Sequence, residues 1–196
     1  MPSPSDAAAG GAAASPAADP AASPAADARD DRLIAGFAAL AIAIHILEAT
    51  LPSPLPGVKP GLANVITVVV LLRYGWYTAA WVAGLRVLAG SLLVGTFLSP
   101  TFILSAGGAV AALLVLWLAR RLAGRWLGAV GYSVCAALAH MGTQVLLAWQ
   151  LFIPHPALLK LAPFLLTAAL VFGIVSGVIA AIVLQKLETG PEASSS

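Results

Sequence analysis

Two ionisable residues, Glu48 and Arg86, stand inside long apolar segments of this sequence. Glu48 follows His45 by three positions, so a helix would carry both on one face. A charged group in hydrocarbon is unfavourable and usually has a functional or pairing role, which makes these residues candidates for binding a polar ligand. The alternative is a structural Glu48–Arg86 ion pair that holds two helices together. The sequence leaves both interpretations open.

His140 and Gln144 form a second polar pair within an apolar segment. Their spacing places them on one helix face, and Gly142 between them lets another helix approach closely. We predict that both side chains face a ligand. A hydrogen bond between two helices is the simpler alternative.

The stretch PLPGVKPGLANVIT (Pro54–Thr67) combines a loop, a lysine and the start of an apolar helix. Pro60 suits the first turn of a helix, because its missing N–H would have no partner there. The free N–H groups of that turn and the charge of Lys59 would attract an anion. Asn64 and Thr67, on one helix face, would add hydrogen bonds. The alternative is a capped turn that binds nothing.

Several kinds of chemistry are excluded by the scarcity of carboxylates. Glu48 is the only acidic residue between Arg32 and Lys186. Glycoside hydrolysis needs a pair of carboxylates, and holding a magnesium diphosphate needs several. The single cysteine, Cys135, has no partner for a disulfide or a thiolate metal site. We therefore predict no catalytic residue, no metal site, no cofactor and no enzymatic activity.

Membrane helices must position these polar residues. Hydrophobic residues make up 60% of the chain and charged residues 9%, with a mean hydropathy of +0.96, and such a composition fits a lipid bilayer. The segments that reach the roughly 17–25 residues needed for a crossing are Leu33–Leu51, Trp76–Phe97, Phe102–Leu118, Val130–Ile153 and Leu158–Leu184. A sixth apolar segment, Leu62–Tyr74, is too short to cross alone and needs the preceding loop, tilt or neighbouring helices.

We predict an all-α integral membrane protein, a compact bundle of about six transmembrane helices with a short second helix after a re-entrant Pro/Gly loop. Residues 1–32 form a disordered cytoplasmic tail, residues 33–187 the membrane domain and residues 188–196 a disordered C-terminal tail. With both termini inside, most Lys and Arg residues are cytoplasmic, as the positive-inside rule favours. The basic cluster Arg120–Trp126 is then an anchor at the lipid surface, and no nucleic-acid partner is predicted.

Small residues recur on the first predicted helix. Ala35, Ala39 and Ala43 are spaced by four and form a smooth stripe. Another helix, from this chain or from a partner subunit, could pack closely against such a stripe.

The quoted motifs also resemble a known family. The stretches PLPGVKPGLANVIT, LRVLAGSLLVG (Leu85–Gly95), LSAGG (Leu104–Gly108) and AHMGTQ (Ala139–Gln144) are similar to the bacterial Gx transporter family, also labelled heptaprenyl diphosphate synthase component I. The resemblance extends from Ile34 to Leu184, nearly the whole membrane domain. Pro60 and Met141 depart from the family pattern, which usually has an aliphatic residue and often an asparagine at these positions.

The resemblance implies a multi-pass protein of the bacterial inner membrane, similar to the substrate-binding components of energy-coupling-factor vitamin transporters. In those proteins, small-residue stripes on the first helix dock to a transmembrane coupling subunit that works with ATPases, which would give the alanine stripe a role. The alternative function is a non-catalytic membrane accessory or anchor for a soluble enzyme such as a polyprenyl diphosphate synthase. The preferred function is a subunit that captures or transports a small polar molecule, an anion included, in a site lined by Lys59, Asn64, Thr67, Glu48, Arg86, His140 and Gln144.

Overall fold

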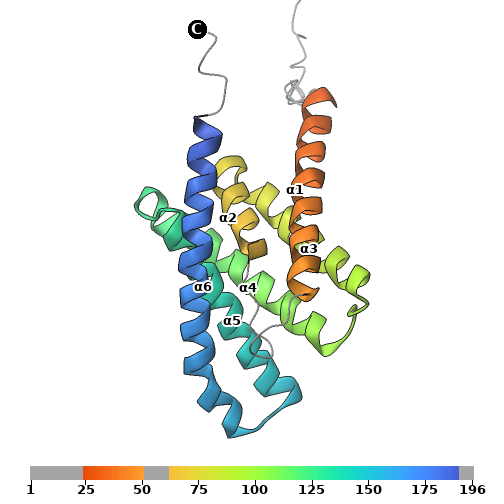
Figure 1. The fold of residues 1–196 in the computed structure, drawn as a ribbon, viewed down its shortest axis with the longest axis vertical. Helices are drawn as coiled ribbons and strands as arrows, with labels where there is room; N and C mark the ends of the chain where they lie inside the picture. The colour runs from red at the N-terminus through yellow and green to blue at the C-terminus, as the bar shows by residue number, and fades with distance from the viewer. Residues whose placement is uncertain (1–23, 51–61, 190–196) are drawn as a thin grey trace, which may run out of the picture.

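The computed structural model describes residues 24–50 and 62–189, and this part of the chain is an all-α bundle (Figure 1). The prediction of an all-α membrane bundle with a short second helix is confirmed. The predicted loop with Lys59, the residues before Pro24 and those after Thr189 lie outside the described residues. The helices are α1 (Pro24–Thr50), α2 (Leu62–Tyr74), α3 (Trp76–Val94), α4 (Pro100–Leu122), α5 (Ala129–Leu147) and α6 (Pro156–Glu188), with a 3₁₀ turn η1 (Gly124–Trp126) and a π-helical turn η2 (Ala148–Phe152).

Four helices of the described residues are long and apolar enough to cross a membrane: α3, α4, α5 together with η2, and α6. Their length and composition make the chain a membrane protein. The total number of crossings stays a prediction.

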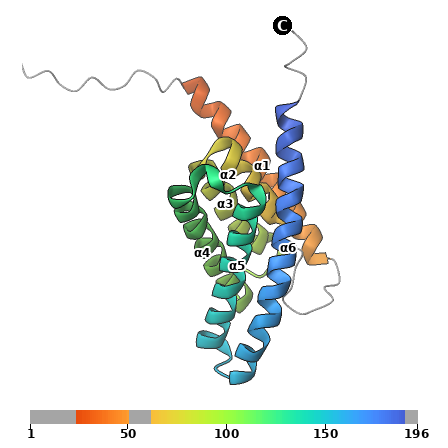
Figure 2. The ribbon, with the colours of Figure 1, turned by 90° about the vertical axis from the view of Figure 1, so that its left-hand side faces the viewer.

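The helices alternate in direction, so the start of α1 and the end of α6 lie at the same end of the bundle (Figures 1 and 2). The helices α2, α4 and α6 finish toward this end, and each has a basic residue in its last turn. These residues are Arg73, Arg120 with Arg121, and Lys186. Their common location is the pattern expected of a cytoplasmic face, which stays a prediction for this end.

Helix α1 begins at Pro24, several residues before the membrane domain predicted from the sequence. The predicted domain boundaries, with a disordered tail over residues 1–32, stay a prediction. Proline is favoured at the first helical position, and the alanines that follow it are strong helix formers.

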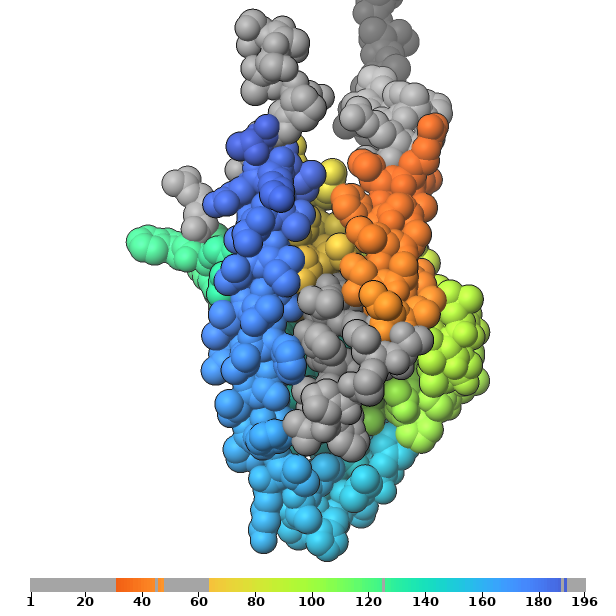
Figure 3. Space-filling view, viewed as in Figure 1, coloured from red at the N-terminus to blue at the C-terminus, as the bar shows by residue number. Residues whose placement is uncertain are grey.

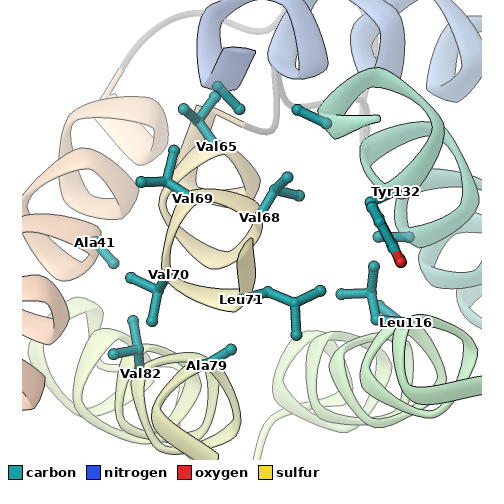
Figure 4. Packing of buried hydrophobic residues seen from close by; sticks show 14 residues of the cluster. Ala41, Val65, Val68, Val69, Val70, Leu71, Ala79, Val82, Leu116 and Tyr132 are labelled. Carbon is teal, nitrogen blue, oxygen red and sulfur yellow. The ribbon is translucent and has the colours of Figure 1, made fainter. Parts of the chain in front are cut away.

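Helix α2 is the centre of the core. It contacts α1, α3, α5 and α6, and only a narrow strip of it is visible between α1 and α6 in Figure 3. Val68, Val70 and Leu71 are fully buried. Figure 4 shows Leu116 of α4 and Tyr132 of α5 on the Leu71 side of α2, and Val82 of α3 next to Val70. Apolar side chains on several sides of α2 fit this burial among neighbouring helices. The surrounding helices thus compensate for the short length of α2.

Helices α5 and α6 pack with their backbones in close contact, because glycines of α6 leave no side chains between them. A Cβ atom on Gly177 would lie 2.5 Å from the Cα atom of Val130, and one on Gly173 would lie 3.1 Å from the Cα atom of Val134. Gly173 and Gly177 are one turn apart, the small-residue spacing that permits close helix packing in membranes.

Two side-chain hydrogen bonds join helix ends near η1. The Arg120 guanidinium donates from Nη1 to the carbonyl oxygen of Leu71 at 3.2 Å, which ties the end of α4 to the end of α2. The Tyr132 hydroxyl donates to the carbonyl oxygen of Gly124 at 2.9 Å. Both acceptors lie near helix ends, and the carbonyl oxygen of Leu71 also accepts from the backbone N–H of Gly75 at 3.2 Å.

Candidate functional site

A partly open cavity of about 110 Å³ lies in the bundle and is lined by residues of α2, α3, α4, α5 and α6. Most of its wall is apolar and consists of six alanines, Gly173, Leu113, Leu116, Met141 and Phe172. The small alanine side chains leave space that larger residues would fill. The polar residues of the wall come from four different helices and are Asn64, Thr67, Arg86, His140 and Ser176.

Thr67 is the most unusual polar residue of the cavity wall. Its side chain is only 4% exposed, and its Oγ1 atom is the one buried side-chain polar atom of the described residues that has no hydrogen-bond partner. A buried hydroxyl without a partner is destabilising, and buried polar groups in native proteins nearly always have one. A ligand in the cavity would supply the missing partner.

A hydrogen bond between α2 and α5 holds the side chain of Asn64 in the cavity wall. Its Nδ2 atom donates to Oγ of Ser133 on α5 at 3.4 Å, and Ser133 is fully buried. One turn separates Asn64 from Thr67 on α2, so both side chains face the cavity.

Arg86 and His140 lie close enough for an electrostatic interaction between their side chains. The imidazole of His140 also packs against Gly108 of α4, where a Cβ atom would lie 2.8 Å from the ring atoms Nδ1 and Cε1. Gly108 therefore gives the ring its room. The cavity wall has a polar corner at this point.

The structure brings together four of the residues predicted for the site: Asn64, Thr67, Arg86 and His140 all line the cavity. Gln144 is one turn further along α5, is partly exposed and is not among the lining residues. Lys59 and the side chain of Glu48 lie outside the described residues. Their roles, and the predicted Glu48–Arg86 pair, stay predictions.

Three positions important for the site were not predicted from the sequence. Ser176 lines the cavity from α6, Gly108 supports the His140 ring, and Ser133 holds Asn64. A serine within an apolar helix is a weak signal, since it can satisfy its own backbone. Gly108 belongs to the LSAGG motif, and the structure shows that it accommodates the His140 ring.

The alanine stripe of α1 faces away from the core. Ala35, Ala39 and Ala43 are exposed, whereas Ala38 and Ala41 on the opposite side are buried. The stripe is therefore free of contacts that would bury it within the described part of the chain.

Metal chemistry finds no support in the described residues, which contain no group of three or more His, Cys, Asp or Glu side chains able to hold a metal ion. Apolar walls with a few polar groups are typical of small-molecule binding sites. The fold and the cavity together define a helical membrane protein with an internal, partly polar cavity.

The chain belongs to the family described as heptaprenyl diphosphate synthase component I, whose model matches residues 37–183. This match confirms the family resemblance seen in the sequence motifs. The family description associates this membrane component with a prenyl diphosphate synthase. No curated protein and no solved structure matches this chain.

Proposed function

We propose that this chain is a membrane subunit that captures a small molecule in the cavity bounded by α2 to α6, as a step in its transport. The observation that carries the proposal is the buried Thr67 hydroxyl without a partner in the cavity wall. Such a group lowers the stability of the empty protein and gains a hydrogen bond when a ligand enters. A protein with no ligand would gain stability from an apolar residue at this position.

The surrounding residues support the same role. Asn64 is positioned by Ser133, and His140 by Gly108, so two polar groups of the wall are held in place before any ligand arrives. Positioned groups bind more tightly than mobile ones, because less conformational entropy is lost on binding.

The direct test is to purify the protein in mild detergent and to identify co-purifying small molecules by mass spectrometry. The expected result is a defined molecule that is retained by wild type and by Thr67→Ser but is depleted in Thr67→Val. Uptake of that molecule into proteoliposomes, with and without the coupling and ATPase subunits, then tests transport. Recovery of only lipids and detergent from all three proteins would contradict the proposal.

The involvement of Lys59 and of an anion is a further part of this proposal. Lys59→Ala is expected to weaken retention of the molecule without unfolding the protein, and Lys59→Arg is expected to keep part of it, because the charge remains while the compact ammonium is lost. An unchanged retention in Lys59→Ala would remove Lys59 from the site.

The exposed stripe of Ala35, Ala39 and Ala43 supports docking to a transmembrane coupling subunit. Small side chains allow another helix to approach closely within the bilayer. Replacing Ala39 by leucine is expected to weaken that association while leaving ligand retention intact. Ala38→Leu is not a suitable control, because Ala38 is buried against the core.

The family description favours a second candidate, a non-catalytic membrane partner of a soluble prenyl diphosphate synthase subunit. The exposed end of α4 and η1 is the surface proposed for this contact, with Trp126 95% exposed and the Arg121 guanidinium stacked 4.9 Å from the ring centroid of Trp117. Co-purification of such a subunit with wild type but not with Trp126→Ala would favour this role.

A further inference from the structure

We infer that the cavity selects a compact, mainly apolar molecule with one principal hydrogen-bonding group, and that this group binds the Thr67 hydroxyl. The inference rests on the proposed binding role of the cavity and narrows its ligand from a small polar molecule to an amphipathic one. Ligand size, the apolar wall and the hydrogen bonds already made within the protein all lead to this class.

The composition of the wall requires a ligand that is mainly apolar. Eleven of its sixteen residues are alanine, glycine, leucine, methionine or phenylalanine, and α4 contributes no polar side chain. Polar groups of a ligand that faced these residues would lose their hydrogen bonds to water without replacement. A molecule with several polar groups spread over its surface is therefore rejected.

Most polar side chains of the wall already make at least one interaction within the protein. Asn64 contacts Ser133, His140 contacts the backbone of Gly108, and Arg86 and Ser176 also take part in interactions within the protein. Thr67 Oγ1 differs from them because it is buried and has no partner. One ligand hydroxyl, carbonyl or carboxylate oxygen would satisfy it, as donor or as acceptor.

The volume of the cavity favours a small ligand. An apolar cavity of about 150 Å³ holds one benzene molecule, so a cavity of about 110 Å³ takes a molecule of similar size or smaller. A polyprenyl diphosphate is many times larger.

A matched pair of probes, cyclopentanol and cyclopentane, tests the inference, since the two differ by one hydroxyl. Binding to the purified protein in detergent is measured by ligand-observed NMR for wild type, Thr67→Ser, Thr67→Val and a variant with a filled cavity, Ala112→Leu. Comparing variants in one detergent removes the contribution of probe that partitions into the micelle.

Cyclopentanol is expected to bind wild type and Thr67→Ser alike, and Thr67→Val about tenfold more weakly, because one buried hydrogen bond is lost. Cyclopentane is expected to bind wild type and Thr67→Val equally. The Ala112→Leu variant is expected to bind neither probe; Ala109→Val serves the same purpose if the leucine prevents folding, because Ala109 lines the same cavity.

Two results would overturn the inference. Equal cyclopentanol binding by wild type and Thr67→Val would show that the hydroxyl is not the selecting group. Unchanged binding of both probes in both filled variants would place the probes outside the cavity.

The outcome is separable from that of the proposed function. Thr67-dependent probe binding, together with no co-purifying molecule and no uptake, would disprove the transport role and leave the site intact. A transported molecule whose retention is independent of Thr67 would disprove this inference and leave the transport role intact.

Discussion

The two halves of α2 have the same secondary structure and opposite kinds of surroundings. In the second half, Val68, Val70 and Leu71 are fully buried against side chains of neighbouring helices (Figure 4). In the first half, Asn64 and Thr67 face a cavity. The packed half contributes stability, whereas the open half contains a hydroxyl that lowers stability until it is paired.

A membrane bundle can keep a cavity open where the helices around it are closely packed elsewhere. Close packing of α2 with Leu116 and Tyr132, and of α5 with the glycines of α6, holds the helices together. That scaffold keeps the alanine-lined space from collapsing, although nothing fills it from within the described residues. Real proteins commonly depart from optimal packing and pairing at functional sites.

The largest expected effect concerns the charge of Arg86, which lines the cavity. If Glu48 and Arg86 form a pair, replacing either one alone leaves a buried charge and should lower the free energy of unfolding by about 3–5 kcal/mol. Replacing both with apolar residues should restore much of that loss. The free energies of unfolding of wild type, the two single variants and the double variant are measured by SDS titration in mixed micelles. Strictly additive losses would show that the two side chains do not interact.

The next effect compares equal truncations in the two regions. Leu71→Ala removes a fully buried side chain from the packed half and should cost about 2–3 kcal/mol, the lower part of the range for such changes, because the alternative environment in lipid is also apolar. Leu113→Ala enlarges a cavity that already exists and should cost less. Equal losses in the same SDS titration would mean that the two regions are equally well packed.

The fold was largely predictable from the sequence because its signals are local and strong. The segment Leu62–Tyr74 was predicted as a short helix from its apolar run and the preceding Pro/Gly loop, and α2 has those bounds. The start of α1 was not predicted, because the composition of residues 24–32 resembles that of the tail before it. The small advantages of a proline at the first position and of alanines after it are hard to see against that background.

The site was predictable only in part. Asn64, Thr67, Arg86 and His140 stood out because polar residues are rare in apolar helices, and all four line the cavity. The alanines that create the space did not stand out in an alanine-rich chain, and the periodicity of one helix does not determine which neighbour its residues meet. Gln144 shows this limit, since it shares a helix face with His140 and does not line the cavity.

A smaller effect, with a distinctive sign, is expected at Thr67. Thr67→Val replaces an unpaired buried hydroxyl by a methyl group of nearly the same shape, and it should raise the free energy of unfolding of the ligand-free protein by about 1–2 kcal/mol. Thr67→Ser keeps the hydroxyl and should not gain this stability. A loss of stability in Thr67→Val would mean that the hydroxyl has a partner within the protein.

The smallest effect removes a hydroxyl from the packed region. Tyr132 is 2% exposed, and its hydroxyl donates to the carbonyl oxygen of Gly124 at 2.9 Å. Tyr132→Phe keeps the ring against Leu71 and Leu116 but loses this hydrogen bond, so it should lower the free energy of unfolding by about 0.5–1.5 kcal/mol. Because Tyr132 does not line the cavity, probe binding should be unchanged. The loss of one hydroxyl should thus destabilise the packed region and stabilise the open one. If Tyr132→Phe and Thr67→Val changed stability in the same direction, the distinction between a satisfied scaffold and an unsatisfied binding site would fail.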